Sequence, residues 1–531
     1  MTARGADLVV VGAGVVGAAC AYFAALAGLR VTVLDRGAAG SGTSSAGEGN
    51  LLVSDKEEGP ELDLALYSRQ VWSQDLAAHG QHWEYEAKGG LVVAASRTSA
   101  AALRQLTAAQ RASGVTAEDV GPQALPDYEP HLSRELAGGA YYPQDAQLQP
   151  MLAVAHLLRL ARESGAEVRT GTEVTGFLRS GARVTGVRTT AGDVPAGAVL
   201  NAAGTWAGEV AALAGVHLPV LPRRGFVLVT EPMPPGTVRH KVYAAEYVGD
   251  VASSDAALQT SPVVESTGAG TILIGASRER VGFDRAFSLP AAAALAAKAV
   301  ALFPMLAEVR LMRTYLGFRP YCPDHLPVIG PDPRAPGLWH ACGHEGAGIG
   351  LSAGTGKLLA QALTGAEPDL DLAPFAPERF AAGPGGGSFD GSGDRSGHGP
   401  GAEAEAAPGG RSEGRPGGGL DHGPGGRSGS GFGSPPADGS GGGPAMSHRM
   451  TFRGRTVTAE PGQSVAAALV AAGITDWRAT RHQGSPRGLF CGIGLCFDCL
   501  LTIDGAPAER ACLVPARDGM RLGEADSDGR A

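Results

Sequence analysis

The chain has 531 residues, enough for two to four domains, and 44% of them are hydrophobic. A net charge of −9 argues against a nucleic-acid-binding surface, and no apolar run reaches the ~18 residues that a membrane span needs, which still leaves room for peripheral attachment to a membrane. Seven cysteines, four of them close together, favour the reducing cytoplasm and a metal centre over disulfide bonds.

The first predicted unit is a strand at residues 8–12, a helix at 18–27 and a second strand at 30–34. Three glycines form the turn before the helix, and an acid closes the second strand: Gly12, Gly14, Gly17 and Asp35. The glycines let the backbone approach a pyrophosphate at the helix N-terminus, and the acid can accept hydrogen bonds from an adenosine ribose. A dinucleotide site is the prediction, and a purely structural βαβ unit is the alternative.

Three further motifs follow in chain order. Residues 41–50 form a second loop rich in glycine and serine, and residues 199–206 read as a strand that ends at a glycine turn. Gly317-Phe-Arg319-Pro320 comes next, and the glycine-rich residues 341–350 then lead into a predicted helix.

These motifs, in this order, resemble those of the D-amino-acid oxidase-like flavoproteins over most of residues 5–370. The resemblance implies an α/β Rossmann-type FAD-binding domain, a mixed β-sheet over a substrate pocket, and oxidation of the Cα–N bond of a small amino or imino acid. It implies that FAD is bound by Gly12, Gly14, Gly17, Asp35, Arg36, Thr43, Ser44, Gly47, Val174, Gly204, Trp206, Gly343, Gly346, Gly348 and Ile349.

The family's Gly-x-Arg-Pro arginine pairs with the substrate carboxylate, and here that residue is Arg319. A planar guanidinium can bind a carboxylate through two hydrogen bonds and so hold the Cα–H over the flavin. A structural salt bridge is the alternative. Glycine oxidase also has an arginine two residues after its Gly-His, where this chain has Gly346. The substrate therefore stays open among glycine, D-hydroxyproline, proline, sarcosine and opines.

Residues 344–348 are predicted to begin the helix that points at the flavin pyrimidine ring. Backbone N–H groups at a helix N-terminus stabilise the negative charge that develops on flavin reduction. His344 is a candidate catalytic residue, although packing and hydrogen bonding are the more ordinary roles of a single histidine in such a loop.

Residues 383–445 are rich in glycine, proline and serine and cannot bury a core, so a disordered linker is predicted. The linker divides the chain into an oxidoreductase module, residues 1–382, and a small module, residues 446–525.

Four cysteines dominate the small module: Cys491, Cys496, Cys499 and Cys512. Their C-x4-C-x2-C…C spacing is the one by which plant-type ferredoxins hold a [2Fe–2S] cluster. Zinc is the alternative, but zinc sites usually show two C-x2-C pairs and this chain has one. A hairpin at 451–459, a helix at 464–472 and a strand at 500–505 complete the pattern of a β-grasp ferredoxin-like domain.

Residues 481–499 resemble the small iron–sulfur subunits of hydrogen cyanide synthase, opine oxidase and D-hydroxyproline dehydrogenase complexes. The resemblance implies a fusion of two subunits, a dehydrogenase that passes electrons through the cluster, and a second flavoprotein of the FAD/NAD(P) type as partner. Two alternatives stay open: an oxygen-using oxidase with a vestigial cluster, and a non-catalytic subunit of a larger assembly.

Overall fold

The structure is a computed structural model that describes residues 5–234, 236–380, 447–479, 486–489, 492 and 498–523. The predicted linker, as well as Cys491 and Cys496, lies outside the described residues. In the described part, no helix is both long enough and apolar enough to cross a bilayer.

The first sheet of the oxidoreductase module has a parallel centre, as the βαβ pattern predicts. Its order is β17 (Val328–Pro331), β18 (Leu338–Cys342), β11 (Gly192–Asn201), β1 (Ala6–Val11), β2 (Val31–Leu34) and β8 (Glu167–Arg169). An antiparallel extension of β9 (Val174–Ser180) and β10 (Arg183–Thr189) joins β11. Since β1 and β2 are fully or largely buried, both read as apolar runs without alternation.

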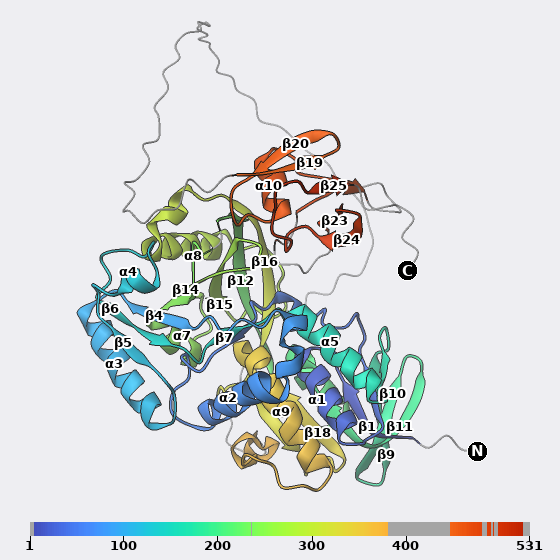
Figure 1. Ribbon diagram of the computed structural model, residues 1–531. Helices are drawn as coiled ribbons and strands as arrows, with labels where there is room; N and C mark the ends of the chain where they lie inside the picture. Colours follow the sequence, from blue (N-terminus) through green and yellow to red (C-terminus); the bar gives the residue numbers. More distant parts are fainter. Residues whose placement is uncertain are drawn as a thin grey trace, which may run out of the picture. The chain divides into compact units, whose positions relative to one another are not determined.

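Helix α1 (Val15–Leu26) begins at the glycine turn, three residues earlier than the sequence predicts, and packs between α9 (Gly348–Leu363) and α5 (Pro150–Glu163) (Figure 1). Small residues permit this packing. A Cβ on Gly356 of α9 would lie only 2.7 Å from the carbonyl carbon of Ala19 on α1. Helices α2 (Pro60–Gln70) and α6 (Ala207–Leu213) complete this half of the module.

The second sheet is mixed, as predicted, with β13 and β4 as its parallel pair and antiparallel pairs elsewhere. Its order is β16 (Leu311–Tyr321), β12 (Leu221–Pro232), β15 (Thr271–Arg278), β14 (Gln259–Ser266), β13 (Lys241–Ala244), β4 (Gly90–Ala94), β6 (Gly138–Tyr142) and β5 (Glu118–Val120). Helix α8 (Leu289–Leu302) packs on β12, β14 and β15, and α3 (Arg97–Ala112) packs on β4 and β6.

The C-terminal domain has a five-stranded sheet and one described helix, α10 (Val465–Ala471), which the Ser464 side chain caps. The sheet order is β20 (Arg455–Ala459), β19 (His448–Phe452), β25 (Arg521–Gly523), β23 (Leu500–Ile503) and β24 (Ala506–Arg510). The predicted hairpin, helix and strand therefore all form, and a buried Trp477 fills the core beside them.

Candidate active site

A cavity of about 610 Å³ opens at the carboxyl ends of β1, β2 and β11 and extends under β16 of the second sheet. Crevices at this edge of an α/β sheet are where such folds bind ligands. Every residue predicted to contact FAD or substrate lines this cavity except Gly17. Sequence positions from 12 to 349 are thus brought to one place.

Gly17 does not line the cavity but packs against the glycine turn that does. A Cβ at this position would lie 2.0 Å from the carbonyl oxygen of Gly12, so only glycine lets α1 approach the end of β1. Gly12 itself has φ +112°, and a Cβ there would lie 2.4 Å from the Ala202 oxygen. Gly14 caps α1, and the Val15 N–H at the helix start donates to Ser44 Oγ at 3.0 Å. The helix N-terminus and Ser44 therefore meet at the predicted pyrophosphate position.

Asp35 and Arg36 follow β2 at the predicted adenosine end. The Asp35 carboxylate accepts the N–H groups of Ala13 and Gly37, both at 2.8 Å. It thus fixes the glycine turn with one lone pair of each oxygen and keeps others for a ligand. The Arg36 guanidinium lies 4.7 Å above the Trp206 ring, and both side chains line the cavity.

The loop that carries Thr43 and Ser44 forms a short 3-10 helix, η1 (Thr43–Ala46), and lies directly against β16. Thr43 Oγ1 donates to the Phe318 oxygen at 2.7 Å, and Thr205 Oγ1 donates to the same oxygen at 2.8 Å. A Cβ on Gly317 would lie 2.5 Å from the Ala46 Cβ. The Gly-x-Arg-Pro strand is therefore pinned to the predicted flavin-binding loop.

Arg319 projects from β16 with protein on all sides but keeps part of its surface open to the cavity. Its Nη1 donates to the Ser277 oxygen at 2.8 Å, and Gly225 makes room for it, because a Cβ there would lie 2.1 Å from Nη1. Burial, and then the positive charge of Arg278, lower the pKa of Arg319 to about 10, so the guanidinium stays charged at neutral pH. A Cβ on Gly346 would lie 3.5 Å from Arg319 Nε, so a side chain at this position would lie against the guanidinium.

His344 is buried, and its Nε2 lies 3.1 Å from Thr355 Oγ1 on α9. Burial lowers the pKa of His344 to about 3, so the ring is neutral at neutral pH. A ring with so low a pKa is a weak base, and its bond to α9 fits a structural role better than that of a proton acceptor.

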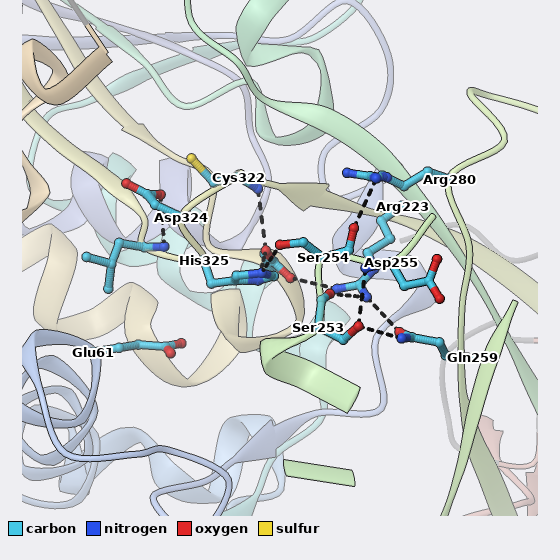
Figure 2. A network of polar contacts seen from close by, with 12 residues as sticks. Glu61, Arg223, Ser253, Ser254, Asp255, Gln259, Arg280, Cys322, Asp324 and His325 are labelled. Carbon is cyan, nitrogen blue, oxygen red and sulfur yellow. Dashed lines mark hydrogen bonds and ion pairs between the residues drawn. The ribbon is translucent and has the colours of Figure 1, made fainter. Parts of the chain in front are cut away.

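The turn after His344 is held by a polar network, part of which Figure 2 shows. Glu345, at φ +44°, lies 2.9 Å from His325 Nδ1 and 3.5 Å from Arg223 Nη1. Arg223 Nη2 donates to the Ser253 oxygen at 2.8 Å, and His325 Nε2 lies 3.0 Å from Ser254 Oγ (Figure 2). The start of α9 is thereby tied to the loop that follows α7 (Glu246–Ala252).

Sequence reasoning missed a group of charged side chains in the same cavity: Glu48, Asp55, Lys56 and Lys241. Lys56 pairs with Asp55 at 2.7 Å. Within the described part of the chain, Lys241 Nζ and Glu48 Oε1 are buried without a hydrogen-bond partner. Lys241 could have revealed this group, because it begins the buried strand β13. A buried lysine needs a partner or a ligand.

Lys241 faces Glu265 across β13 and β14, since Val242 pairs with Val264. Burial is the main cause that raises the pKa of Glu265 to about 7, against the opposing effect of Lys241. Beside this pair, the cavity contains the polar atoms of Lys241 and Glu48 that have no hydrogen-bond partner in the described part of the chain.

Of the four predicted cluster ligands, the structure describes Cys499 and Cys512, and it buries both in the core of the C-terminal domain. The Ala511 N–H donates to the Cys499 oxygen at 3.2 Å, and the Trp477 indole donates to the same oxygen at 3.3 Å. Two cysteines with twelve residues between them are thus brought to adjacent backbone positions, as a shared cluster requires.

Comparison with protein families matches residues 7–362 to the FAD-dependent oxidoreductase model, and residues 447–526 to a 2Fe-2S iron-sulfur cluster binding domain. The chain belongs to the FAD-dependent oxidoreductase family. The predicted cofactors, FAD and a [2Fe–2S] cluster, and the predicted enzyme class are confirmed at this level.

The chain is 30% identical to the hydrogen cyanide synthase subunit HcnC of Pseudomonas aeruginosa over 71% of its length and 97% of the relative. It is 34% identical to the glycine oxidase of the same organism over 70% of its length and 98% of the relative. The crystal structure of glycine oxidase from Geobacillus kaustophilus superposes with a TM-score of 0.64 at 29% identity, covering 70% of this chain and 98% of that one.

The fold also matches the crystal structure of L-proline dehydrogenase from P. horikoshii, with a TM-score of 0.66 at 23% identity over 71% of this chain and 98% of that one. The predicted architecture of the oxidoreductase module is therefore confirmed.

FAD suits the cavity of this oxidoreductase. Two of its lining glycines, Gly12 and Gly49, lie where a Cβ would collide with a backbone oxygen, and the N-termini of α1 and α9 line it with backbone N–H groups. FAD supplies the hydride acceptor when bound. The protein supplies the helix N-terminus of α9, the cation of Arg319, and walls that exclude bulk water.

Proposed function

We propose that this oxidoreductase is a fused dehydrogenase of small amino or imino acids. Residues 1–382 oxidise the Cα–N bond, and residues 446–525 carry electrons away through the [2Fe–2S] cluster. The observation that carries the proposal is the position of Arg319. Its guanidinium opens into the same cavity as the glycine turns, and the tie from η1 to β16 fixes its place relative to them.

In this proposal the substrate carboxylate pairs with Arg319, and the Cα–H faces the flavin-binding half of the cavity. Glu48 attracts the substrate amino group, which gives its extra proton to solvent water before the C–H bond breaks, since a neutral amine is the species that gives up hydride readily. His344 stays neutral and keeps α9 in place.

The partner is proposed to be a second flavoprotein of the FAD/NAD(P) type. The similarity to a protein named as a subunit of hydrogen cyanide synthase supports a larger complex. The reducing cytoplasm would suit the clustered cysteines.

Arg319→Ala tests the carboxylate role. Loss of a desolvated charge pair costs ~2–5 kcal/mol, or roughly 30- to several-thousand-fold in kcat/KM. FAD content should be unchanged, and the control Arg310→Ala, on an exposed loop, should leave kinetics unchanged. Anaerobic flavin reduction with a panel of amino and imino acids is the measurement. Wild-type kinetics for Arg319→Ala on every substrate would refute the role.

Cys512→Ser tests the relay. The variant should still reduce its flavin in one anaerobic turnover but fail to pass electrons to the partner flavoprotein. The control Glu509→Gln, exposed in the same domain, should do both. Peroxide production at the rate of flavin reduction would favour an oxidase instead, and absence of flavin reduction by any amino acid in the wild type would favour a non-catalytic subunit.

A further inference from the structure

Three histidines lie together outside the active-site cavity. His79 and His82 belong to the 3-10 helix η3 (Ala77–Trp83), and His156 belongs to α5. In a 3-10 helix, residues three apart lie on the same face, so His79 and His82 point the same way. One ring nitrogen from each of the three lies within 4.8 Å of the other two.

Aromatic packing explains only part of this arrangement. The rings of His79 and His156 lie 5.9 and 5.4 Å from the ring of the buried Trp83 and cover it. His82 is exposed, yet its ring stacks on that of His156 with centroids 4.3 Å apart. An exposed imidazole gains little from burying apolar surface, so packing on Trp83 does not account for the position of His82.

We propose that His79, His82 and His156 form a binding site for one divalent transition-metal ion, with Zn²⁺ as the reference ion. Imidazole nitrogens bind such ions at ~2.0–2.1 Å, so the three rings, whose nitrogens lie within 4.8 Å of one another, must rotate out of their stacked arrangement to converge on an ion. The exposure of His82 leaves the fourth position open to water. An all-nitrogen site of this kind suits zinc, nickel or copper rather than magnesium or calcium.

The neighbouring charges allow the site to form. Arg159 Nη2 lies 2.9 Å from His156 Nε2, and the same arginine pairs with Glu163 one turn further along α5. When His156 turns to a metal ion, Arg159 keeps Glu163 as its partner.

The site would join η3 to α5. The backbone already links them, because the Gln149 N–H before α5 donates to the Trp83 oxygen at 2.8 Å. Helix α5 also packs against the predicted flavin-binding loop, because a Cβ on Gly40, which lines the cavity, would lie only 2.8 Å from the Met151 side chain. A bound ion should therefore stabilise η3 and α5, which lie behind the predicted flavin-binding loop, without contacting the flavin.

The test uses the holoenzyme with FAD and cluster in place. Calorimetric titration with Zn²⁺ should show one site per chain, with unchanged iron content and a raised thermal midpoint. His82→Ala, which leaves the cover of Trp83 intact, should weaken binding at least tenfold, and His131→Ala, another exposed histidine, should not. With both cofactors oxidised, the EPR spectrum of added Cu²⁺ should show coupling to several nitrogens, because an oxidised cluster and oxidised FAD give no signal.

Equal Zn²⁺ affinity for the wild type and His82→Ala would overturn the proposal. So would loss of iron in proportion to the zinc bound, which would place the ion at the cysteines, or a Cu²⁺ spectrum without nitrogen coupling.

Discussion

The two ends of the active-site cavity are built on opposite principles. At the predicted nucleotide end, Gly12 and Gly14 line the cavity without side chains, and Gly17 behind them lets α1 approach β1. At the substrate end, Arg319, Lys241 and Glu48 place charged side chains inside the protein. The first end depends on steric fit, because a Cβ on Gly12 or Gly17 would collide with a backbone oxygen. The second depends on electrostatics, and each of its charges can be removed without a clash.

Gly17→Val should have the largest effect. Its Cβ would lie 2.0 Å from the Gly12 oxygen, so α1 and β1 would have to separate. We expect protein without FAD, or no soluble protein. Gly121→Val, whose Cβ would have its nearest neighbour at 3.9 Å, is the control. Flavin content per chain is the measurement. A full complement of FAD in Gly17→Val would show that steric fit at this position is not required for FAD binding.

Lys241→Met should have an intermediate effect. If Lys241 binds a polar group of the substrate, its loss should lower kcat/KM by roughly 10- to 100-fold, in line with ~1.5–3 kcal/mol for a hydrogen bond to a charged group, and leave FAD bound. Lys88→Met is the matched control, because Lys88 also acts on Glu265 but does not line the cavity. Equal losses in both variants would show that Lys241 acts only through Glu265.

The smallest effect should come from His344. The unfolded chain binds the proton near pH 6.5, whereas the folded protein binds it near 3, so this group's stabilisation is complete above pH 6.5 and is lost as the pH falls from there. The loss should approach 1.4 kcal/mol per pH unit.

Thermal midpoints at pH 7.5 and 5.5 measure the effect of His344. The midpoint should drop less for His344→Gln, which can still bond Thr355, than for the wild type. Parallel drops would contradict the assignment of a buried neutral ring.

The two ends also differ in how far the sequence predicts them. The glycine turn can be predicted from a short stretch of sequence, because Gly12 and Gly17 lie close together in the chain. The parallel sheet around them follows from the same local pattern. Lys241 and Glu265 face each other only because β13 and β14 pair in one register, and Glu48 comes from a loop far earlier in the sequence, so no short motif joins the three. Arg319 was predictable only because its motif resembles that of a known family.

Two details could be seen only in three dimensions. The Asp35 carboxylate holds Ala13 and Gly37 besides facing the ligand position, so its function is partly structural. His79 and His82 lie more than seventy residues from His156, and no spacing rule joins residues that far apart.

The contact between η1 and β16 limits how this enzyme can change its substrate. One strand carries both Arg319 and the carbonyl of Phe318 that anchors Thr43 and Thr205. Any shift of β16 that enlarged the pocket would also move the flavin-binding loop. New substrate preferences should therefore arise from positions that face Arg319 without belonging to its strand. Gly346 is one such position, since a Cβ there would lie 3.5 Å from Arg319 Nε, and a side chain added there would shorten the pocket while the contact between η1 and β16 stayed in place.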